Sequence, residues 1–183
     1  IPRGLAALGY TLNTPEENKY LVQKHELMAE VDVLLGGRAA EELFIGEIST
    51  GAANDLERAT DILKAMIMYY GMSDVTGLMV LEKQRNTFLG GGMCGGRDYS
   101  EKTSEEVDAY IKAKLSERYE AVKAKLELYR EAMETMTAVL LDVEVIEKEK
   151  VEEIIKDFEE KNGIIRESNE EELHSDESHV KNG

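Results

Sequence analysis

The carboxylate of Asp55 is the side chain in this sequence that is best placed to do chemistry. It follows a turn containing two cap-forming residues, Ser49 and Thr50, and falls in the first turn of a predicted helix, where the helix dipole favours negative charge. Asp55 lies about 100° from Leu56 and one turn before Ala59, so it borders the apolar stripe of that helix. A carboxylate in this position needs a cap, a cation or a metal as its partner. The alternative is an ordinary acidic residue of a first helical turn.

The composition limits the kinds of partner that this chain can have. Its 183 residues include 22 Lys and Arg against 38 Asp and Glu, a formal net charge of −16. Such a chain lacks the basic surface needed to bind nucleic acid or an anionic membrane surface. No signal peptide is expected in the sequence as given, and none of its apolar runs approaches the roughly 20 residues that span a bilayer. Its single cysteine, Cys94, excludes an internal disulfide and fits a reducing compartment.

The spacing of the apolar residues predicts a mainly α fold with a small β-strand element. The expected helices are 15–35, ended by Gly36 and Gly37; 38–44, ended by Gly46; a helix from the Asp55 turn to Tyr70, ended by Gly71; 104–141; and 151–158. Short strands are expected within residues 5–12, 75–81 and 86–89. We expect residues 1–160 to form one domain and the acidic segment 161–183 to be a disordered tail.

Residues 104–141 carry a heptad pattern, which makes this the longest expected element. Its apolar positions step alternately by four and three residues: Leu115, Tyr119, Val122, Leu126, Tyr129, Met133, Met136 and Leu140. That spacing predicts one long helix or a helical hairpin, packed along a seam within the chain rather than as a dimer zipper. The preceding run Gly90–Gly96 is too glycine-rich to hold one conformation, so we interpret it as a linker, or alternatively as a flap over a substrate cleft.

Several longer motifs together resemble one known family. They are GGRAAEE (36–42), STGA (49–52), NDL (54–56) and AT (59–60), with IPRG (1–4), LGYT (8–11), GMS (71–73) and FLG (88–90) fitting the same pattern. In this order they resemble the peptidase domain of the FtsH family, the ATP-dependent, membrane-anchored zinc proteases. A series of long motifs in the correct order is much more specific than one short signature.

The resemblance implies a Zn²⁺ site in which Asp55 is the third protein ligand. Zinc proteases use three protein ligands and leave the fourth position for water, and an H-E-x-x-H helix supplies two histidines and a general-base glutamate. This sequence contains no H-E-x-x-H: His25 and Glu26 begin like one, but Ala29 stands where the second histidine is required. In the family that motif precedes the IPRG block, so we expect a partial peptidase domain that is inactive alone, and an ordinary helical role for His25.

Glu41 and Glu42 are the other carboxylates to weigh. The resemblance implies that Glu41 orients a zinc-binding histidine, as metal sites usually require, or that Glu41 replaces Asp55 as the third ligand. The alternative is a solvated acidic pair. Arg38 is spaced to pair with Glu42 four residues later, or it contacts a carboxylate of another subunit.

For the whole protein, the resemblance implies an ATP-dependent, membrane-anchored zinc metalloendopeptidase that degrades unfolded or damaged membrane and cytosolic proteins. Polypeptide substrates would be threaded in by an ATPase ring upstream of the peptidase part, in a homo-hexamer that binds ATP there. An N-terminal anchor would hold it in the cell inner membrane, with the peptidase domain on the cytoplasmic side. The competing interpretation is a non-catalytic helical oligomerisation module, in which the heptad seam and the GGR segment contact other subunits.

Overall fold

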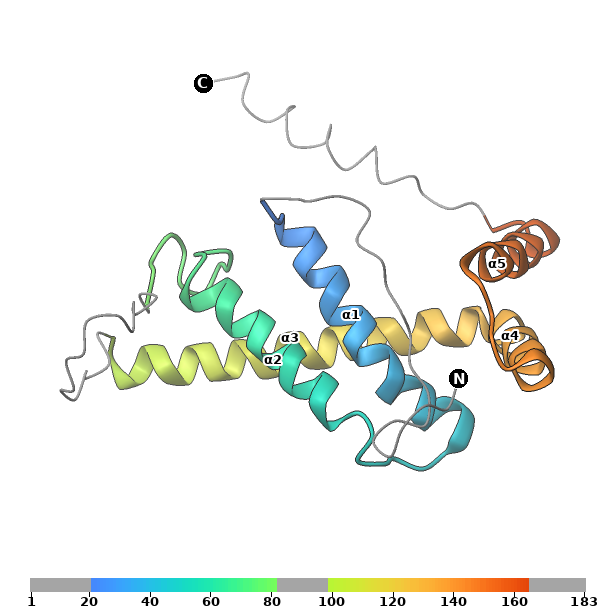
Figure 1. Ribbon diagram of the computed structural model, residues 1–183. Coiled ribbons are helices and arrows are strands. Elements are labelled where there is room, and N and C mark those ends of the chain that lie inside the picture. Colours follow the sequence, from blue (N-terminus) through green and yellow to red (C-terminus); the bar gives the residue numbers. More distant parts are fainter. Residues whose placement is uncertain (1–20, 82–98, 165–183) are drawn as a thin grey trace, which may run out of the picture. The chain divides into compact units, whose positions relative to one another are not determined.

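The computed structural model describes residues 21–81 and 99–164, which are mainly helical (Figure 1). The elements are α1 (Lys24–Ala40), the π-helical turn η1 (Glu41–Ile45), α2 (Ala53–Met68), α3 (Glu101–Leu128), α4 (Arg130–Val143) and α5 (Lys148–Asn162). The chain divides into two compact units, a first containing α1 to α3 and a second containing α4 and α5. In these ranges, no helix is both long and apolar enough to cross a bilayer. The predicted mainly α fold is confirmed.

The described residues contain no β-strand. Residues 75–81, where a strand was expected, form turns, and one isolated antiparallel bridge joins Ser73 to Gly77. Gly71 and Gly77 have φ angles of 59° and 55°, which bend the backbone where an extended strand would need negative φ. The expected strands at 5–12 and 86–89, the run Gly90–Gly96 and nearly all of the tail lie outside the described residues.

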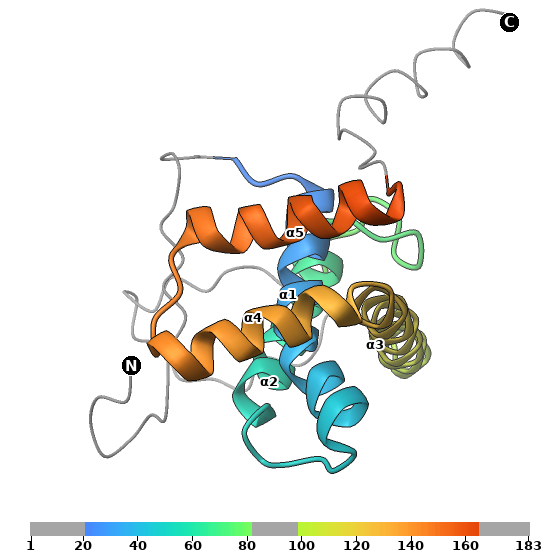
Figure 2. The same ribbon diagram turned by 90° about the vertical axis from the view of Figure 1, so that its right-hand side faces the viewer.

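Three helices build the core of the first unit. α1 and α2 lie side by side in opposite directions, and α3 crosses both (Figures 1 and 2). The buried core residues are Val31, Leu34, Leu35, Ala59, Leu63, Met66, Ile67, Leu81, Val107 and Ile111. Burying one large aliphatic side chain of this kind stabilises the fold by about 1.5–3 kcal/mol. α1 packs against both α2 and α3, so it links the three helices of this core.

The expected end of the first helix at Gly36 and Gly37 was wrong. α1 runs through both glycines to Ala40, continues into η1, and ends at Gly46, whose φ is 77°. Each glycine in a helix interior costs about 1 kcal/mol relative to alanine. Leu35 and Ala39 are buried on either side of the pair, so tertiary packing holds the helix where local propensity favours a break. The start was also misplaced: α1 begins at Lys24, and Leu21 is 86% exposed.

The heptad segment forms two helices rather than one. α3 ends at Leu128 and α4 begins at Arg130, with Tyr129 between them at φ −94° and ψ 17°. Leu115, Tyr119 and Val122 pack against the core of the first unit, whereas Tyr129 and Met136 pack against the core of the second. Packing within the chain is therefore confirmed for these five residues of the seam. The long-helix version of the prediction was wrong because the two halves of the seam are buried by different partners.

The second unit is a small helical hairpin. α4 and α5 pack against each other (Figure 2). Ala132, Ile154 and Phe158 form their buried core. The ring of Tyr129 lies 5.4 Å from that of Phe158, and its hydroxyl donates a 2.8 Å hydrogen bond to the buried carboxylate of Glu159. α5 confirms the helix expected around residues 151–158, and Gly163 ends it with φ 65°.

Truncating Leu63 should test the core of the first unit. Leu63 is 2% exposed, so Leu63→Ala should lower the free energy of unfolding by about 2–5 kcal/mol through lost burial and the resulting cavity. Leu78→Ala is the matched control because Leu78 is 97% exposed, and it should change stability by less than about 0.5 kcal/mol. Urea unfolding followed by circular dichroism measures both, and equal losses for the two variants would contradict this core.

Candidate metal centre

Asp55 lies in the first turn of α2, as predicted, beside the end of α1. Its side chain is partly buried, and its Oδ2 is 4.0 Å from the position that a Cβ on Gly37 would occupy. Within residues 21–81 and 99–164, no group forms a hydrogen bond or ion pair with this carboxylate. Both oxygens of Asp55 therefore keep their capacity to bind a cation, next to a helix surface that carries no side chain.

Ser49 does not cap α2, contrary to the expectation for this turn. The residue at the cap position is Ala52, and no side chain bonds the helix end there. Ser49 instead turns back toward α1: its hydroxyl donates to Glu41 Oε1 at 2.6 Å and its amide donates to Glu41 Oε2 at 3.1 Å. Gly51 N–H donates to the Ser49 hydroxyl at 3.0 Å, and Arg38 donates to the Ser49 carbonyl at 3.1 Å.

These contacts fix the loop that leads into α2 onto the end of α1. A Cβ on Gly51 would lie 3.1 Å from Ser49 Oγ and 3.4 Å from Glu41 Oε1, closer than side chains normally approach. A larger residue here would make the Ser49 side chain give way by a few tenths of an ångström, so glycine suits the closure of the loop over Glu41. Because Asp55 follows four residues after Gly51, Glu41 and Arg38 help to determine where its carboxylate lies.

Glu41 is held as a carboxylate by this loop. The Ser49 hydroxyl lowers the pKa of Glu41 most, the Ser49 amide lowers it further, and the positive charge of Arg38 adds to both effects. Arg38 Nη1 lies 3.9 Å from Glu41 Oε2. Each oxygen of Glu41 already accepts one hydrogen bond from Ser49, so a metal would have to share this carboxylate with the loop.

Glu42 points to α3, where its partly exposed carboxylate has two partners. Its carboxylate accepts a 2.5 Å hydrogen bond from the Tyr119 hydroxyl and a 2.8 Å bond from Lys123 Nζ. Lys123 and then Tyr119 lower the pKa of Glu42, while burial and the Glu42 carboxylate raise the pKa of Tyr119. The expected direct pair with Arg38 does not form: Arg38 donates to the Ser49 carbonyl and lies beside Glu41. No local pattern in the sequence pointed to partners this far along the chain.

His25 is far from Asp55. It is exposed near the start of α1, twelve positions before Gly37, which corresponds to roughly 18 Å along a helix axis. In the part of the chain that the structure describes, no three His, Cys, Asp or Glu side chains gather closely enough to hold a metal. Asp55 therefore fits a zinc site as one carboxylate donor, and the remaining donors of such a site must come from elsewhere.

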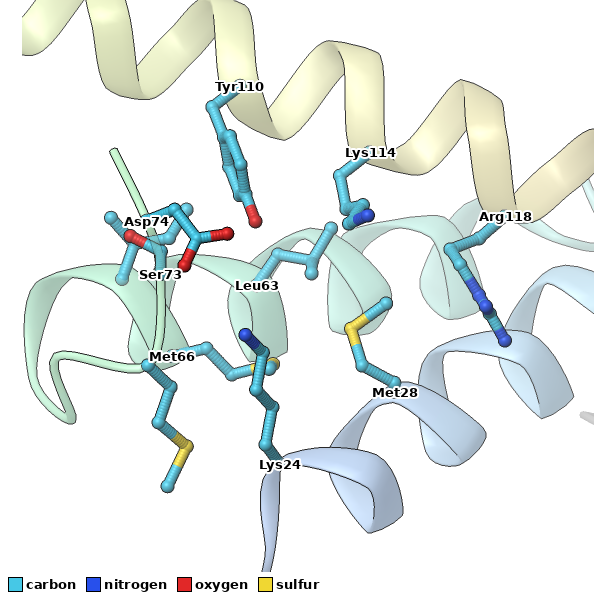
Figure 3. Close-up of a pocket in the computed structure, with 11 residues that line it drawn as sticks. Lys24, Met28, Leu63, Met66, Ser73, Asp74, Tyr110, Lys114 and Arg118 are labelled. Atoms are coloured by element: carbon cyan, nitrogen blue, oxygen red, sulfur yellow. The ribbon is translucent and has the colours of Figure 1, made fainter. Parts of the chain in front are cut away.

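A small cavity lies at the opposite end of α2 from Asp55. Its volume is about 190 Å³, and its lining combines methionines with charged side chains (Figure 3). Met28, Leu63 and Met66 form part of its apolar wall, and Lys24 and Asp74 stand among its polar groups. Neither Asp55 nor Glu41 lines it, so this cavity is separate from the candidate metal centre.

The Ser49 amide proton should report the ionisation of Glu41. Its NMR chemical shift should titrate with a midpoint below 4.5, the ordinary pKa of a glutamate, because the loop favours the charged form. The stability that this contact adds is present above pH 4.5 and is lost as the pH falls through the lowered pKa. Glu41→Gln should abolish the titration. A midpoint at or above 4.5, or a titration that persists in Glu41→Gln, would contradict the assignment.

Comparison with known proteins places these features in one family. Residues 1–154 match the model of "Peptidase family M41". The chain is 68% identical to a protein of Helicobacter pylori J99 named "ATP-dependent zinc metalloprotease FtsH", over 90% of this chain and 26% of that protein. Proteins of the same name from Sulfurovum sp. and Thermotoga maritima are 60% and 41% identical, over 90% and 86% of this chain and 24% and 26% of their own lengths.

The chain thus spans about a quarter of the length of these curated relatives. The family match covers most of the 183 residues and includes Asp55, Glu41 and the helices that carry them. The chain belongs to peptidase family M41, as an FtsH-type peptidase domain.

Proposed function

We propose that this chain is the peptidase part of an ATP-dependent zinc metalloendopeptidase, and that Asp55 is its third protein ligand to zinc. The observation that carries the proposal is the Asp55 carboxylate: it is partly buried, has no partner among the described residues, and faces the bare surface of Gly37. In a chain of the M41 family, a carboxylate held open in this way is suited to bind a metal. Carboxylate oxygens are common zinc ligands in proteins, at about 2.0–2.2 Å.

Several residues of this chain would support that role. Asp55 lies in the first turn of α2, at the positive end of the helix dipole. Glu41 and Arg38 hold the loop before α2 through Ser49, and Gly37 leaves room beside the carboxylate. Zinc, when bound, would supply Lewis-acid activation of a water for attack on a peptide carbonyl.

Asp55 is a better candidate ligand than Glu41. The two oxygens of Glu41 accept hydrogen bonds from the Ser49 hydroxyl and amide, whereas those of Asp55 accept none from any described residue. Glu41 then affects metal binding only indirectly, by fixing the Ser49 loop that leads to Asp55. The other two protein ligands and the general base would come from an H-E-x-x-H motif, which these 183 residues do not contain. The chain alone would therefore be inactive.

The whole protein would act on polypeptides. We propose that an ATPase ring in a homo-hexamer threads unfolded or damaged membrane and cytosolic proteins to this domain, where internal peptide bonds are cut. An N-terminal anchor would hold the protein in the inner membrane, with this domain on the cytoplasmic side. The names of the relatives support ATP dependence and zinc for this proposal.

Replacing Asp55 in the full-length protein tests the assignment. Asp55→Ala should reduce zinc affinity by at least about tenfold and abolish casein cleavage, while ATP hydrolysis continues. Asp61→Ala is the matched control, because Asp61 is an exposed acid on the same helix, and it should retain zinc and cleavage. Metal content is measured by mass spectrometry and affinity by competition with a chelator.

Three results would contradict the proposal. Full zinc occupancy in Asp55→Ala together with loss of zinc in Glu41→Ala would make Glu41 the ligand. Equal loss of zinc in Asp61→Ala would show a general effect of charge. A full-length protein that neither binds zinc nor cleaves casein would favour the non-catalytic oligomerisation module.

A further inference from the structure

Polar contacts join α3 to α1 and its continuation η1 at two places. Arg118 forms a two-pronged ion pair with Asp32, with Nε donating to Oδ1 at 2.7 Å and Nη2 to Oδ2, and Figure 3 shows Arg118 extending from α3 toward α1. The second place is Glu42, which binds Tyr119 and Lys123. The side chains of Lys123 and Glu42 are 21% and 39% exposed, so this pair lies partly open to solvent.

Glu41 and Glu42 are consecutive in η1 but act on different parts of the molecule. Glu41 holds the Ser49 loop, and Glu42 is held by α3. A continuous set of contacts thus leads from Lys123 and Tyr119 through η1 to the loop that begins α2. Short π-helical segments of this kind occur frequently at functional sites.

We propose that Lys123 and Tyr119 are positioning residues for the candidate metal ligand Asp55. This inference rests on the proposed function, since it takes Asp55 to be a metal ligand. Both residues lie more than sixty positions after Asp55 in the sequence. A metal ligand has to be held within about 0.5 Å of its productive position by packing and supporting hydrogen bonds. By fixing Glu42, these two residues of α3 prevent η1 from shifting and taking the Ser49 loop with it.

Positioning differs from general stabilisation in a way that can be measured. If Lys123 only stabilises the fold, any variant of α3 that destabilises the first unit equally should loosen the loop equally. Val107→Ala provides that comparison, because Val107 is a buried core residue of α3 and takes no part in the contacts with Glu42. If Lys123 positions the loop, its variant should loosen the loop more than Val107→Ala does.

The experiment uses full-length protein in four forms: Lys123→Met, Lys123→Arg, Lys125→Met and Val107→Ala. Lys125 is an exposed lysine on the same helix, which makes it the matched control. Hydrogen exchange of the Ser49 and Gly51 amides is measured on protein stripped of metal by a chelator. Zinc affinity is measured separately by chelator competition.

Lys123→Met should speed exchange at both amides about tenfold or more and weaken zinc binding about tenfold, in line with the effect of losing residues that support metal ligands. Lys123→Arg should retain most of both properties, because it can still donate to Glu42. Lys125→Met should match the parent protein, and Val107→Ala should leave the two amides less affected than Lys123→Met.

Unchanged exchange in Lys123→Met, or equally fast exchange in Val107→Ala, would overturn the inference. Faster exchange with unchanged zinc affinity would also overturn it, while the proposed function stands if Asp55→Ala still loses zinc. If Asp55→Ala retains zinc, the proposed function fails. Lys123 and Tyr119 then cannot be positioning residues for a metal ligand. The exchange measured without metal would still show whether α3 holds the loop.

Discussion

The burial of α1 between α2 and α3 is the constraint on which the first unit depends. Val31, Leu34 and Leu35 of α1 belong to the buried core that all three helices share. This packing keeps α1 helical through Gly36 and Gly37, where the local sequence favours a break. Because the helix continues, its far end reaches the start of α2. Gly37 then lies beside Asp55, and Glu41 lies beneath the Ser49 loop.

The end of α1 separates two carboxylates that look equivalent in the sequence. Glu41 and Glu42 are adjacent acids, yet one binds a serine in the next loop and the other binds a lysine and a tyrosine of α3. In both cases the partners stabilise the charged form, which lowers the pKa of each glutamate. Asp55 is left as the nearby carboxylate that no described residue engages. Two occupied carboxylates therefore lie near one available carboxylate, which favours Asp55 as the position where a cation would bind.

Much of the fold followed from periodicity, but the positions of the breaks did not. The helix after the Asp55 turn, its end near Gly71, the end of η1 at Gly46 and the last helix were all predicted, because each combines apolar spacing with a local stop signal. A helical hairpin was one of the two predictions for the heptad segment, but the break at Tyr129 was not located, since the heptad pattern continues through it and only the change of packing partner reveals it. The continuation of α1 through Gly36 was not predicted for the opposite reason: a strong local signal for a helix end is outweighed by packing in the core.

Some features of the candidate site could also be predicted from the sequence, and others could not. The place of Asp55 in a first helical turn was predictable from cap-forming residues and the helix dipole, although Ser49 serves Glu41 rather than the helix. The partners of Glu42 were not predictable, because 77 and 81 residues separate it from Tyr119 and Lys123. A single sequence shows which residue types lie near each other along the chain. It does not show which distant helix will supply a cation.

The glycine pair within α1 also bears on how the domain folds. Two adjacent glycines close to the C-terminal end of α1 weaken the helix there, so packing against α2 and α3 is needed to join the segment beyond them to the rest of α1 as one rod. Formation of that rod is thus coupled to contacts between residues that are distant along the chain, and such coupling slows folding. The junction beside Asp55 would then be among the last parts of the domain to acquire its native shape.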